Sequence, residues 1–293
     1  MRSNDSPKID QSRIYDVLVV GGGNAALCAA MTARQAGATV LLLECAPKDF
    51  RGGNSRHTQN LRYVHESANG HLTGPYLEEE FWRDLLQVTD GQTNERLARL
   101  IIHESNDIGK WMTQHGCHFQ PSMRGTLHLS RTNAFFLGGG KALMNAYYAT
   151  TQKIGVDILY ETEVFDLKIS GGRFTSATCI SNGSAQNVKA KTVVVFSGGF
   201  QANIKWLSKC WGASANNFIV RGTPYDTGQM LRVLLDKGAK PVGNPRQCHA
   251  IALDARAPKF DGGIVTVRFF HERYTNSKQL IYPLRNFFRQ HSS

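Results

Sequence analysis

The chain has 293 residues, of which 41% are hydrophobic and 10% aromatic, which is enough to build a folded core and argues against intrinsic disorder. No stretch approaches the roughly 18–20 consecutive apolar residues that span a bilayer, and the polar first fifteen residues lack the apolar run of a secretory signal. The six cysteines form no C-x-x-C pair and no metal-ligand spacing, so we expect a soluble, cytoplasmic protein with reduced thiols and no metal.

The formal net charge of +11 raises the question of a nucleic-acid partner, because clustered Lys and Arg side chains neutralise phosphates. Here the basic residues are dispersed, and no run of five or more like charges occurs. The last thirty residues are the most biased part, with five basic side chains, one acidic side chain and several aromatic ones. This pattern favours an anionic small molecule, and we expect no nucleic-acid partner.

The first strong motif is a strand–turn–helix–strand unit near the N-terminus. Residues 15–20 (YDVLVV) predict a buried strand that runs into GGGNAA at 21–26, which fits G-x-G-x-x-G/A with alanine in the last place. Residues 27–35 have the apolar spacing of a helix, and Gly37 is placed to end it. Residues 39–44 predict a second strand that ends in Glu44, at the spacing expected for a ribose-binding carboxylate.

Each position of this unit has a physical task in dinucleotide binding. Gly21 allows the tight turn, and Gly23 lets the backbone approach a pyrophosphate, which the unpaired N–H groups of the helix start would bind. Glu44 would accept hydrogen bonds from ribose hydroxyls, and a small residue at 26 lets helix and strand pack closely. The candidate cofactor residues in this unit are therefore Gly21, Gly23, Asn24, Ala25, Ala26 and Glu44.

The segment RGGNSRHT at 51–58 suits a backbone that passes beside a ring system, and it adds Gly52, Gly53, Asn54 and Ser55 to the cofactor candidates. Together, GGGNAALCAA, ECAP and RGGNSRHT resemble the fumarate reductase/succinate dehydrogenase flavoprotein superfamily, and within it the FAD-dependent tricarballylate dehydrogenases. The resemblance extends over about residues 15–266. It implies an α/β fold, namely a Rossmann-like FAD-binding domain with an inserted β-meander, followed by the start of a truncated capping domain.

The middle of the chain fits the same resemblance. Helices are expected around 77–87, 94–115 and 143–153, a strand at 158–164, and a meander over 165–169 and 174–181. The run FFLGGGKA at 135–142 is not a P-loop, because phenylalanine and alanine stand where that motif needs glycine and Ser/Thr. In relatives, a valine at the place of Val164 contacts adenine, and the turn VVVFSGGF at 193–200, with Gly198, resembles a flavin-side turn of the superfamily.

Two later segments complete the site implied by the resemblance. RGTPYDTG at 221–228 stands at the place of a family turn that opens a helix beside the flavin, which makes Asp226 a cofactor candidate. QCH at 247–249 resembles the start of the substrate-capping domain, where the histidine holds a substrate carboxylate, so His249 and the guanidinium of Arg56 are the substrate-binding candidates. Some membrane-bound relatives attach FAD through a histidine near the place of His57; the register differs here, so we expect non-covalent FAD.

The resemblance divides the chain into a flexible tail (1–14), an FAD-binding domain (15–245), the start of a capping domain (246–266) and a divergent basic, aromatic tail (267–293). The family's catalytic arginine has no match, so we expect a truncated product with little or no activity. Three hypotheses remain. The first is a tricarballylate-type dehydrogenase that passes hydride from a tricarboxylate C–C bond to flavin N5. The second is a non-catalytic FAD-binding remnant, or a relative specific for fumarate, aspartate or ketosteroid, and the third is a binding module built on the basic tail. The expected partners are a polycarboxylate substrate, an unknown electron acceptor and a peripheral contact with a membrane electron-transfer protein.

Overall fold

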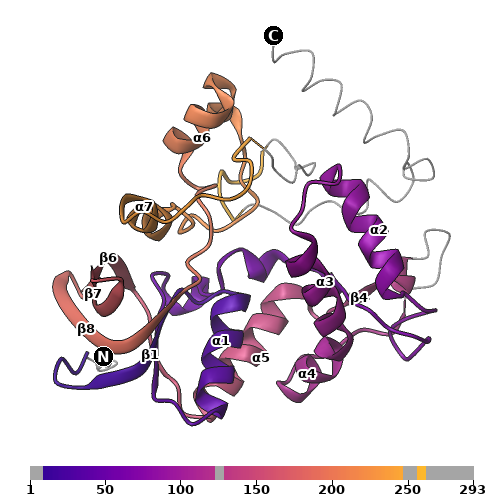
Figure 1. Ribbon diagram of the computed structural model, residues 1–293, viewed down its shortest axis with the longest axis horizontal. Coiled ribbons are helices and arrows are strands. Elements are labelled where there is room, and N and C mark those ends of the chain that lie inside the picture. The colour runs from indigo at the N-terminus through magenta and orange to yellow at the C-terminus, as the bar shows by residue number, and fades with distance from the viewer. Residues whose placement is uncertain (1–8, 123–128, 247–255, 262–293) are drawn as a thin grey trace.

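The computed structural model describes residues 9–122, 129–246 and 256–261 (Figure 1). The helices in this part of the chain are α1 (Asn24–Gln35), α2 (Glu78–Thr89), α3 (Glu95–Glu104), α4 (Ile108–Gln114), α5 (Gly139–Lys153), α6 (Ile204–Trp211) and α7 (Gln229–Asp236). The strands are β1 (Ile14–Val20), β2 (Val40–Leu43), β3 (Asn60–Arg62), β4 (Asn133–Phe135), β5 (Asp157–Leu159), β6 (Thr162–Ser170), β7 (Arg173–Ser181) and β8 (Ser184–Val195). No helix among these is both long and apolar enough to cross a membrane.

A six-stranded mixed sheet organises the fold, in the order β5-β2-β1-β8-β7-β6. β5, β2, β1 and β8 are parallel, whereas β8, β7 and β6 form an antiparallel meander. β8 is long enough to belong to both parts, since its first half pairs with β7 and its second half with β1. This arrangement confirms the predicted α/β class with an inserted meander.

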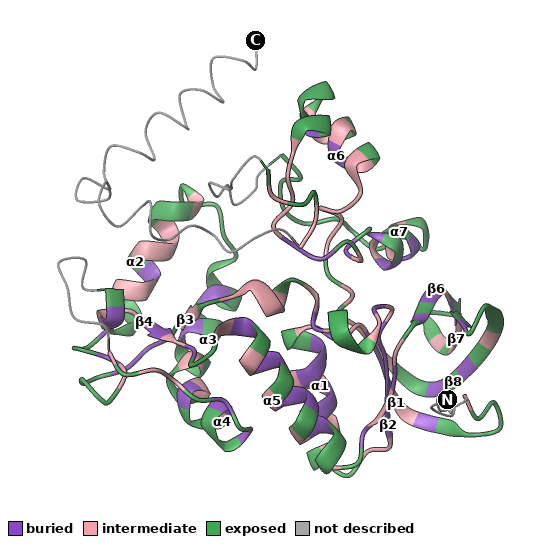
Figure 2. Ribbon diagram, turned by 180° about the vertical axis from the view of Figure 1, so that it is seen from behind, coloured by how far each residue is buried: buried purple, intermediate pink, exposed green. Residues whose placement is uncertain are grey.

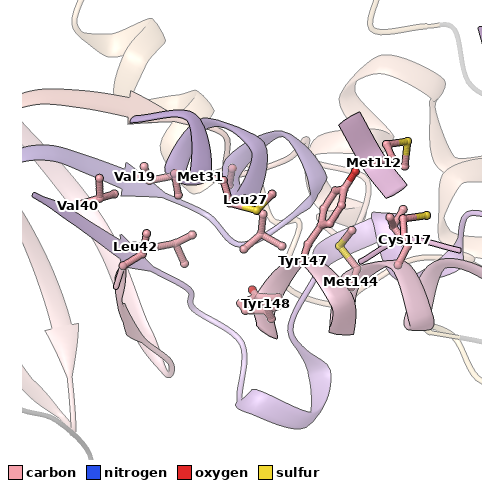
Figure 3. Packing of buried hydrophobic residues seen from close by; sticks show 14 of the residues in the cluster. Val19, Leu27, Met31, Val40, Leu42, Met112, Cys117, Met144, Tyr147 and Tyr148 are labelled. Carbon is pink, nitrogen blue, oxygen red and sulfur yellow. The ribbon is translucent and has the colours of Figure 1, made fainter. Parts of the chain in front are cut away.

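Both faces of the parallel strands are covered, which explains why residues 17–20 of β1 and all of β2 are continuous apolar runs. On one face, Val19 and Leu42 pack against Leu27 and Met31 of α1 and against Tyr148 of α5 (Figure 3). α1 and α5 lie side by side, and their inward residues are buried (Figure 2). The core therefore sits between these two helices and the sheet.

The opposite face is covered by the meander and by α7. Leu18 and Leu41, which alternate along their strands with the residues above, pack with Leu167 of β6 and with Met230 and Val233 of α7. α7 thus lies beside β6, over the ends of the parallel strands (Figure 1). This packing brings a late segment of the chain next to the N-terminal turn.

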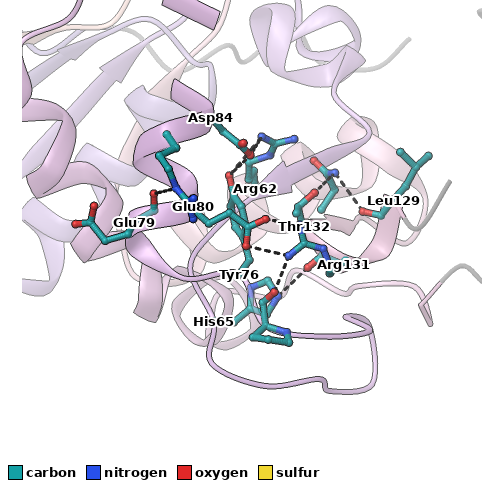
Figure 4. Close-up of polar contacts among 12 residues, drawn as sticks. Arg62, His65, Tyr76, Glu79, Glu80, Asp84, Leu129, Arg131 and Thr132 are labelled. Carbon is teal, nitrogen blue, oxygen red and sulfur yellow. Dashed lines mark hydrogen bonds and ion pairs between the residues drawn. The ribbon is translucent and has the colours of Figure 1, made fainter. Parts of the chain in front are cut away.

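A smaller helical layer, made of α2, α3 and α4 with the two-stranded antiparallel sheet of β3 and β4, lies on the other side of α5 (Figure 1). Its polar contacts join α2 to β3 and to the residues just before α2 and β4: Asp84 accepts hydrogen bonds from Tyr76 (2.8 Å) and Arg62 (3.1 Å), and Arg131 pairs with Glu80 (Figure 4). The charged side chains are partly exposed, so each of these ion pairs contributes at most about 1 kcal/mol. They fix orientation more than they add stability.

Two predicted elements are divided in the structure. The strand expected at 158–164 is split into β5 and β6 at Glu161, whose left-handed φ of 51° breaks the extended run. The helix expected at 94–115 is split into α3 and α4 by a 3₁₀ turn at Ser105–Asp107. α1 and α5 each begin earlier than expected, at Asn24 and Gly139, because apolar spacing does not mark the polar or glycine-rich first turn.

The start of α5 packs tightly against the segment that follows β2. Gly140 donates its backbone N–H to the carbonyl of Thr58 (2.7 Å), and a Cβ at position 140 would collide with the carbonyl of Ser55 and the backbone of Arg56. Gly52 in turn lies against the side chain of Met144. The 52–57 segment is therefore positioned by backbone contact with a helix.

This contact predicts the effect of Gly140→Ala. In an open helix interior this change would stabilise the fold by about 1 kcal/mol. Here the added methyl group must displace backbone, so we expect a loss of about 1–3 kcal/mol in the free energy of unfolding. Lys141→Ala, on the exposed neighbour, serves as control and should change stability by less than about 0.5 kcal/mol in the same chemical denaturation experiment. A Gly140→Ala variant as stable as the native chain would contradict the packing.

Candidate functional site

A cavity of about 500 Å³ lies at the carboxyl ends of β1, β2 and β8. It is bounded by the glycine-rich turn at 21–25, the 53–55 segment, the turn after β8 and the apolar residues of α7. All of the predicted cofactor residues except Ala26 and Gly52 line it. This is the place where ligands bind in open α/β sheets, because the strand ends and helix starts leave a crevice there.

The three glycines of the turn serve different purposes. Gly21 has a φ of 110°, and a Cβ there would collide with the carbonyl of Phe196. A Cβ on Gly22 would collide with the hydroxyl of Tyr148 and the carboxylate of Glu44. Gly23, in contrast, has an ordinary extended conformation, and its Cβ would meet only Ser55 Oγ at 3.7 Å and Gly52 O at 3.8 Å. The fold requires glycine at 21 and 22 but not at 23, where the open space belongs to the cavity.

Glu44 is a buried carboxylate at the edge of the cavity, with 4% of its surface exposed. Its Oε1 accepts the backbone N–H of Ala46 (2.9 Å), and its Oε2 lies 3.5 Å from the hydroxyl of Tyr148, which itself donates to the carbonyl of Gly22 (2.8 Å). Burial raises the pKa of Glu44 above its usual range. The Cys45 thiol and the backbone of Gly52 also donate to this carboxylate, so Glu44 is held in place, and its remaining lone pairs can accept from a ligand.

The 53–55 segment joins two parts of the cavity wall. Ser55 Oγ accepts the backbone N–H of Asn24 at the start of α1 (3.1 Å). Asn54 Oδ1 accepts the backbone N–H of Thr223 (2.9 Å), and a Cβ on Gly222 would collide with this amide. The segment therefore holds the N-terminal turn and the 220s turn at a fixed separation.

Asp226 is the second buried carboxylate of the cavity. Its Oδ2 accepts a hydrogen bond from Gln201 (2.6 Å), and Gly198 packs so closely on it that a side chain at 198 would collide with its Oδ1. Burial, reinforced by the negative charge of Glu44 and opposed by the Gln201 hydrogen bond, raises the pKa of Asp226 to about 7. No Lys or Arg is among the described residues that line the cavity.

The remaining sequence candidates lie in different places. Val164 is buried on β6 and lines the cavity, whereas Ala26 faces the core of α1 and Gly52 packs on Met144. Arg56 lies outside the cavity, with its guanidinium 3.8 Å from Asp261. His249 lies outside the described residues.

Sequence reasoning missed several residues of the cavity. Gln201, the partner of Asp226, follows the glycine turn directly, and that position could have marked it. Tyr148 lies in the apolar face of a helix. The sequence pattern cannot distinguish a tyrosine whose hydroxyl reaches the glycine turn from an ordinary core residue. The apolar residues of α7 that line the cavity cannot be recognised from a single sequence, because the packing of α7 against the meander brings them there. Its members are Met230, Leu231 and Leu234.

The cavity fits a dinucleotide. Its glycine turn opens directly onto the N-terminus of α1, whose partial positive charge and N–H groups favour a phosphate. Position 23 leaves room that no protein atom fills, and Glu44 is a buried hydrogen-bond acceptor in the lining of the same cavity. The fold and the cavity together define a Rossmann-like dinucleotide-binding domain.

The chain belongs to the FAD binding domain family, which matches residues 16–254. It falls within the fumarate reductase/succinate dehydrogenase flavoprotein superfamily, and its cofactor is FAD. The chain is 26% identical over 284 residues to an NADH:fumarate oxidoreductase of Klebsiella pneumoniae, covering 90% of this chain and 30% of that protein. It is 26% identical over 238 residues to a vinyl phenol reductase of Lactiplantibacillus plantarum, covering 78% and 47%. The chain thus spans less than half the length of these relatives.

Solved structures show the same fold. The open conformation of a flavocytochrome c3 fumarate reductase superimposes with a TM-score of 0.68 at 21% identity, covering 79% of this chain and 42% of that one. A 3-ketosteroid-Δ4-(5α)-dehydrogenase from Rhodococcus jostii RHA1 superimposes with a TM-score of 0.67 at 20% identity, covering 81% and 56%.

The glycine turn yields a pair of contrasting substitutions. Gly23→Ala should leave the free energy of unfolding of the FAD-free chain almost unchanged, because the fold has room for the methyl group. It should weaken FAD binding by about 1–3 kcal/mol, because the methyl group occupies space needed by the ligand. Gly21→Ala should instead destabilise the FAD-free chain by at least about 2 kcal/mol. Denaturation and FAD titration of both variants check this; equal loss of stability in the two would contradict it.

The raised pKa of Asp226 predicts a pH-dependent stability. Between the unfolded value of 3.8 and the folded value of about 7, the FAD-free native state holds a proton that the unfolded state has lost, so stability falls as pH rises. Asp226→Asn removes this loss. Its gain in unfolding free energy over the native chain should grow from near zero at about pH 4 to as much as about 4 kcal/mol above pH 7. A gain that is the same at every pH would show that Asp226 titrates normally.

Proposed function

We propose that this chain supplies the FAD-binding part of an oxidoreductase of the fumarate reductase type, acting on a C–C bond of a polycarboxylate. The observation that carries the proposal is the cavity that joins an open glycine position, a helix N-terminus and a buried carboxylate. Each of these features complements a different part of the cofactor.

The binding roles follow from the chemistry of the lining residues. The backbone N–H groups at Gly23 and Ala25 donate to the diphosphate, and Glu44 accepts from the ribose hydroxyls. Asn24 lines the same turn, with its own backbone N–H held by Ser55 Oγ. Because no described Lys or Arg lines the cavity, the backbone carries the task of holding the phosphates. Gly21 and Ala26 support the turn and its helix, and Val164 contacts adenine. The flavin-side candidates are Gly52, Gly53, Asn54, Ser55, Gly198 and Asp226.

FAD, when bound, supplies the acceptor or donor of the electron pair and hydrogen that pass to or from the substrate C–C bond. The apolar residues of α7 exclude water from one side of the cavity, and Asp226 can hold or release a proton near neutral pH. Arg56 and His249 are proposed to bind substrate carboxylates. We expect the cofactor to be held without a covalent bond.

Among polycarboxylates, the resemblance of RGGNSRHT and its neighbouring motifs favours tricarballylate, with the flavin accepting hydride. The curated relatives include an NADH:fumarate oxidoreductase and a vinyl phenol reductase, so fumarate and other unsaturated acceptors are the alternative substrates. A non-catalytic FAD-binding role is the second candidate function. The domain limits proposed above, with the capping region beginning at about residue 246, apply to either case. Neither candidate function specifies the electron-transfer partner, which could be a peripheral membrane protein.

The absorbance spectrum of the chain reconstituted with FAD distinguishes these functions. Bleaching of the visible flavin band by tricarballylate under anaerobic conditions supports the dehydrogenase. Reoxidation of chemically reduced flavin by fumarate supports a reductase instead. Flavin that is retained but responds to neither supports the non-catalytic role, and a chain that retains no flavin contradicts all three.

Glu44→Gln tests the ribose contact separately from the chemistry. The amide keeps the shape but loses the charge, so FAD should bind about 10- to 100-fold more weakly, as expected for a lost hydrogen bond to a charged group. The FAD-free variant should at the same time be more stable than the native chain, because burial disfavours the ionised form of Glu44.

Glu163→Gln is the matched control, since Glu163 lines the same cavity but is exposed. Its FAD affinity, measured by titration of flavin fluorescence, should stay within about twofold of the native value. Equal losses of affinity in the two variants would point to overall charge and not to a contact at Glu44.

A further inference from the structure

Beyond the wall formed by Asn54 and Thr223, a second charged cluster stands outside the FAD cavity. His57 Nε2 lies 2.6 Å from Asp261 Oδ1, and Arg56 Nη2 lies 3.8 Å from Asp261 Oδ2. Arg221 precedes Gly222, whose carbonyl accepts the backbone N–H of Asp261 (2.6 Å). The cluster thus brings together the segment after the glycine-rich 52–53 turn, the 220s turn and the 256–261 segment.

The cluster holds more positive than negative charge. Burial, with Arg221 and Arg56 acting in the same direction against Asp261, lowers the pKa of His57, so its imidazole is neutral near pH 7. The guanidinium of Arg56 then pairs with Asp261, and the positive charge of Arg221 also acts on His57. The Nε of Arg221 is buried without a hydrogen-bond partner among the described residues, and Arg56 has only 9% of its side chain exposed. A nearly buried guanidinium and a buried, unpaired guanidinium nitrogen favour an added anion.

Asp261 fits this cationic site poorly. Neither its Oδ1 nor His57 Nε2 makes an aligned hydrogen bond, despite their short separation. The 3.8 Å contact with Arg56 is a single, long ion pair and not the two-pronged contact that a guanidinium offers to a carboxylate. Asp261 also has a left-handed φ of 53°, which costs free energy in a residue with a side chain. A free carboxylate could satisfy the same donors better.

We propose that Arg56, His57 and Arg221 form a carboxylate-binding subsite and that Asp261 is its internal occupant, which a substrate carboxylate displaces. This inference rests on the proposed function, because the incoming carboxylate belongs to the polycarboxylate substrate. The exchange is neutral in charge, since one carboxylate replaces another on the same donors. Asp261 is then a specificity-determining residue, because only a ligand whose carboxylate binds the guanidinium groups more strongly than Asp261 does can displace it.

The competition has a measurable consequence. The apparent affinity of a ligand is reduced by the fraction of molecules whose site is already filled, so removing the internal competitor raises it. Asp261→Asn removes the charge while keeping the backbone, because asparagine tolerates the left-handed conformation as well as aspartate does. Succinate is a suitable probe, as a small dicarboxylate.

We expect Asp261→Asn to lower the Kd of succinate for the FAD-loaded chain by about tenfold in titration calorimetry, and Arg221→Gln to raise it by a similar factor. Asp49→Asn is the matched control: it removes the same charge at an exposed carboxylate that lines a surface pocket with Arg56 but forms no ion pair with it, and should change the Kd by less than about twofold. Denaturation of each variant confirms that it is folded.

An unchanged or higher Kd in Asp261→Asn, a similar decrease in Asp49→Asn, or no succinate binding by any variant would each overturn the subsite. The flavin spectrum of the same samples keeps this result separate from the proposed function. A native chain that retains FAD but fails these tests refutes only the subsite, and a chain that retains no FAD refutes the proposed function. In that second case the titration is made on the FAD-free chain, because the cluster lies outside the cavity.

Discussion

Close backbone contact at the carboxyl end of β1 is the constraint on which the site depends. Gly21 passes against the backbone of Phe196, and Gly22 lies under Tyr148 and Glu44, so neither position has room for a side chain. This packing turns the chain abruptly from the centre of the sheet into α1. The first N–H groups of the helix then face a cavity and not the protein interior. The fold itself does not require glycine at position 23, so we attribute the glycine there to the space that the ligand needs.

The electrostatics of the cavity follow from the same geometry. Two carboxylates, Glu44 and Asp226, are buried there, and burial raises the pKa of both. With no described cation in the lining, the phosphates are matched by backbone dipoles and the ribose by a carboxylate, so each part of the cofactor meets its complement. The cationic side chains are kept apart, in the cluster around Arg56 and Arg221. The cluster that we propose as a carboxylate subsite therefore lies outside the lining of the cofactor cavity.

Much of this architecture is predictable from the sequence, because its signals are local. The apolar run before GGGNAA, the helix after it and the acid that ends β2 lie within one short unit, and residues 171–172 mark the meander turn. The features that the sequence does not predict depend on contacts between residues far apart in the chain. The break at Glu161, the ring of Tyr148 under the turn and the α7 wall all arise from how separate elements pack. The pairing of His57 with Asp261 joins positions far apart in the chain, and no local pattern marks it.

Competition binding tests most directly whether the glycine turn and Glu44 hold the adenosine diphosphate part of the cofactor. FAD bound to the chain, followed by its fluorescence, should be displaced by ADP in a competitive manner. FMN, which lacks that part, should bind far more weakly than FAD. Equal affinity for FMN and FAD, with no displacement by ADP, would contradict the account, because the flavin ring alone would then hold the cofactor.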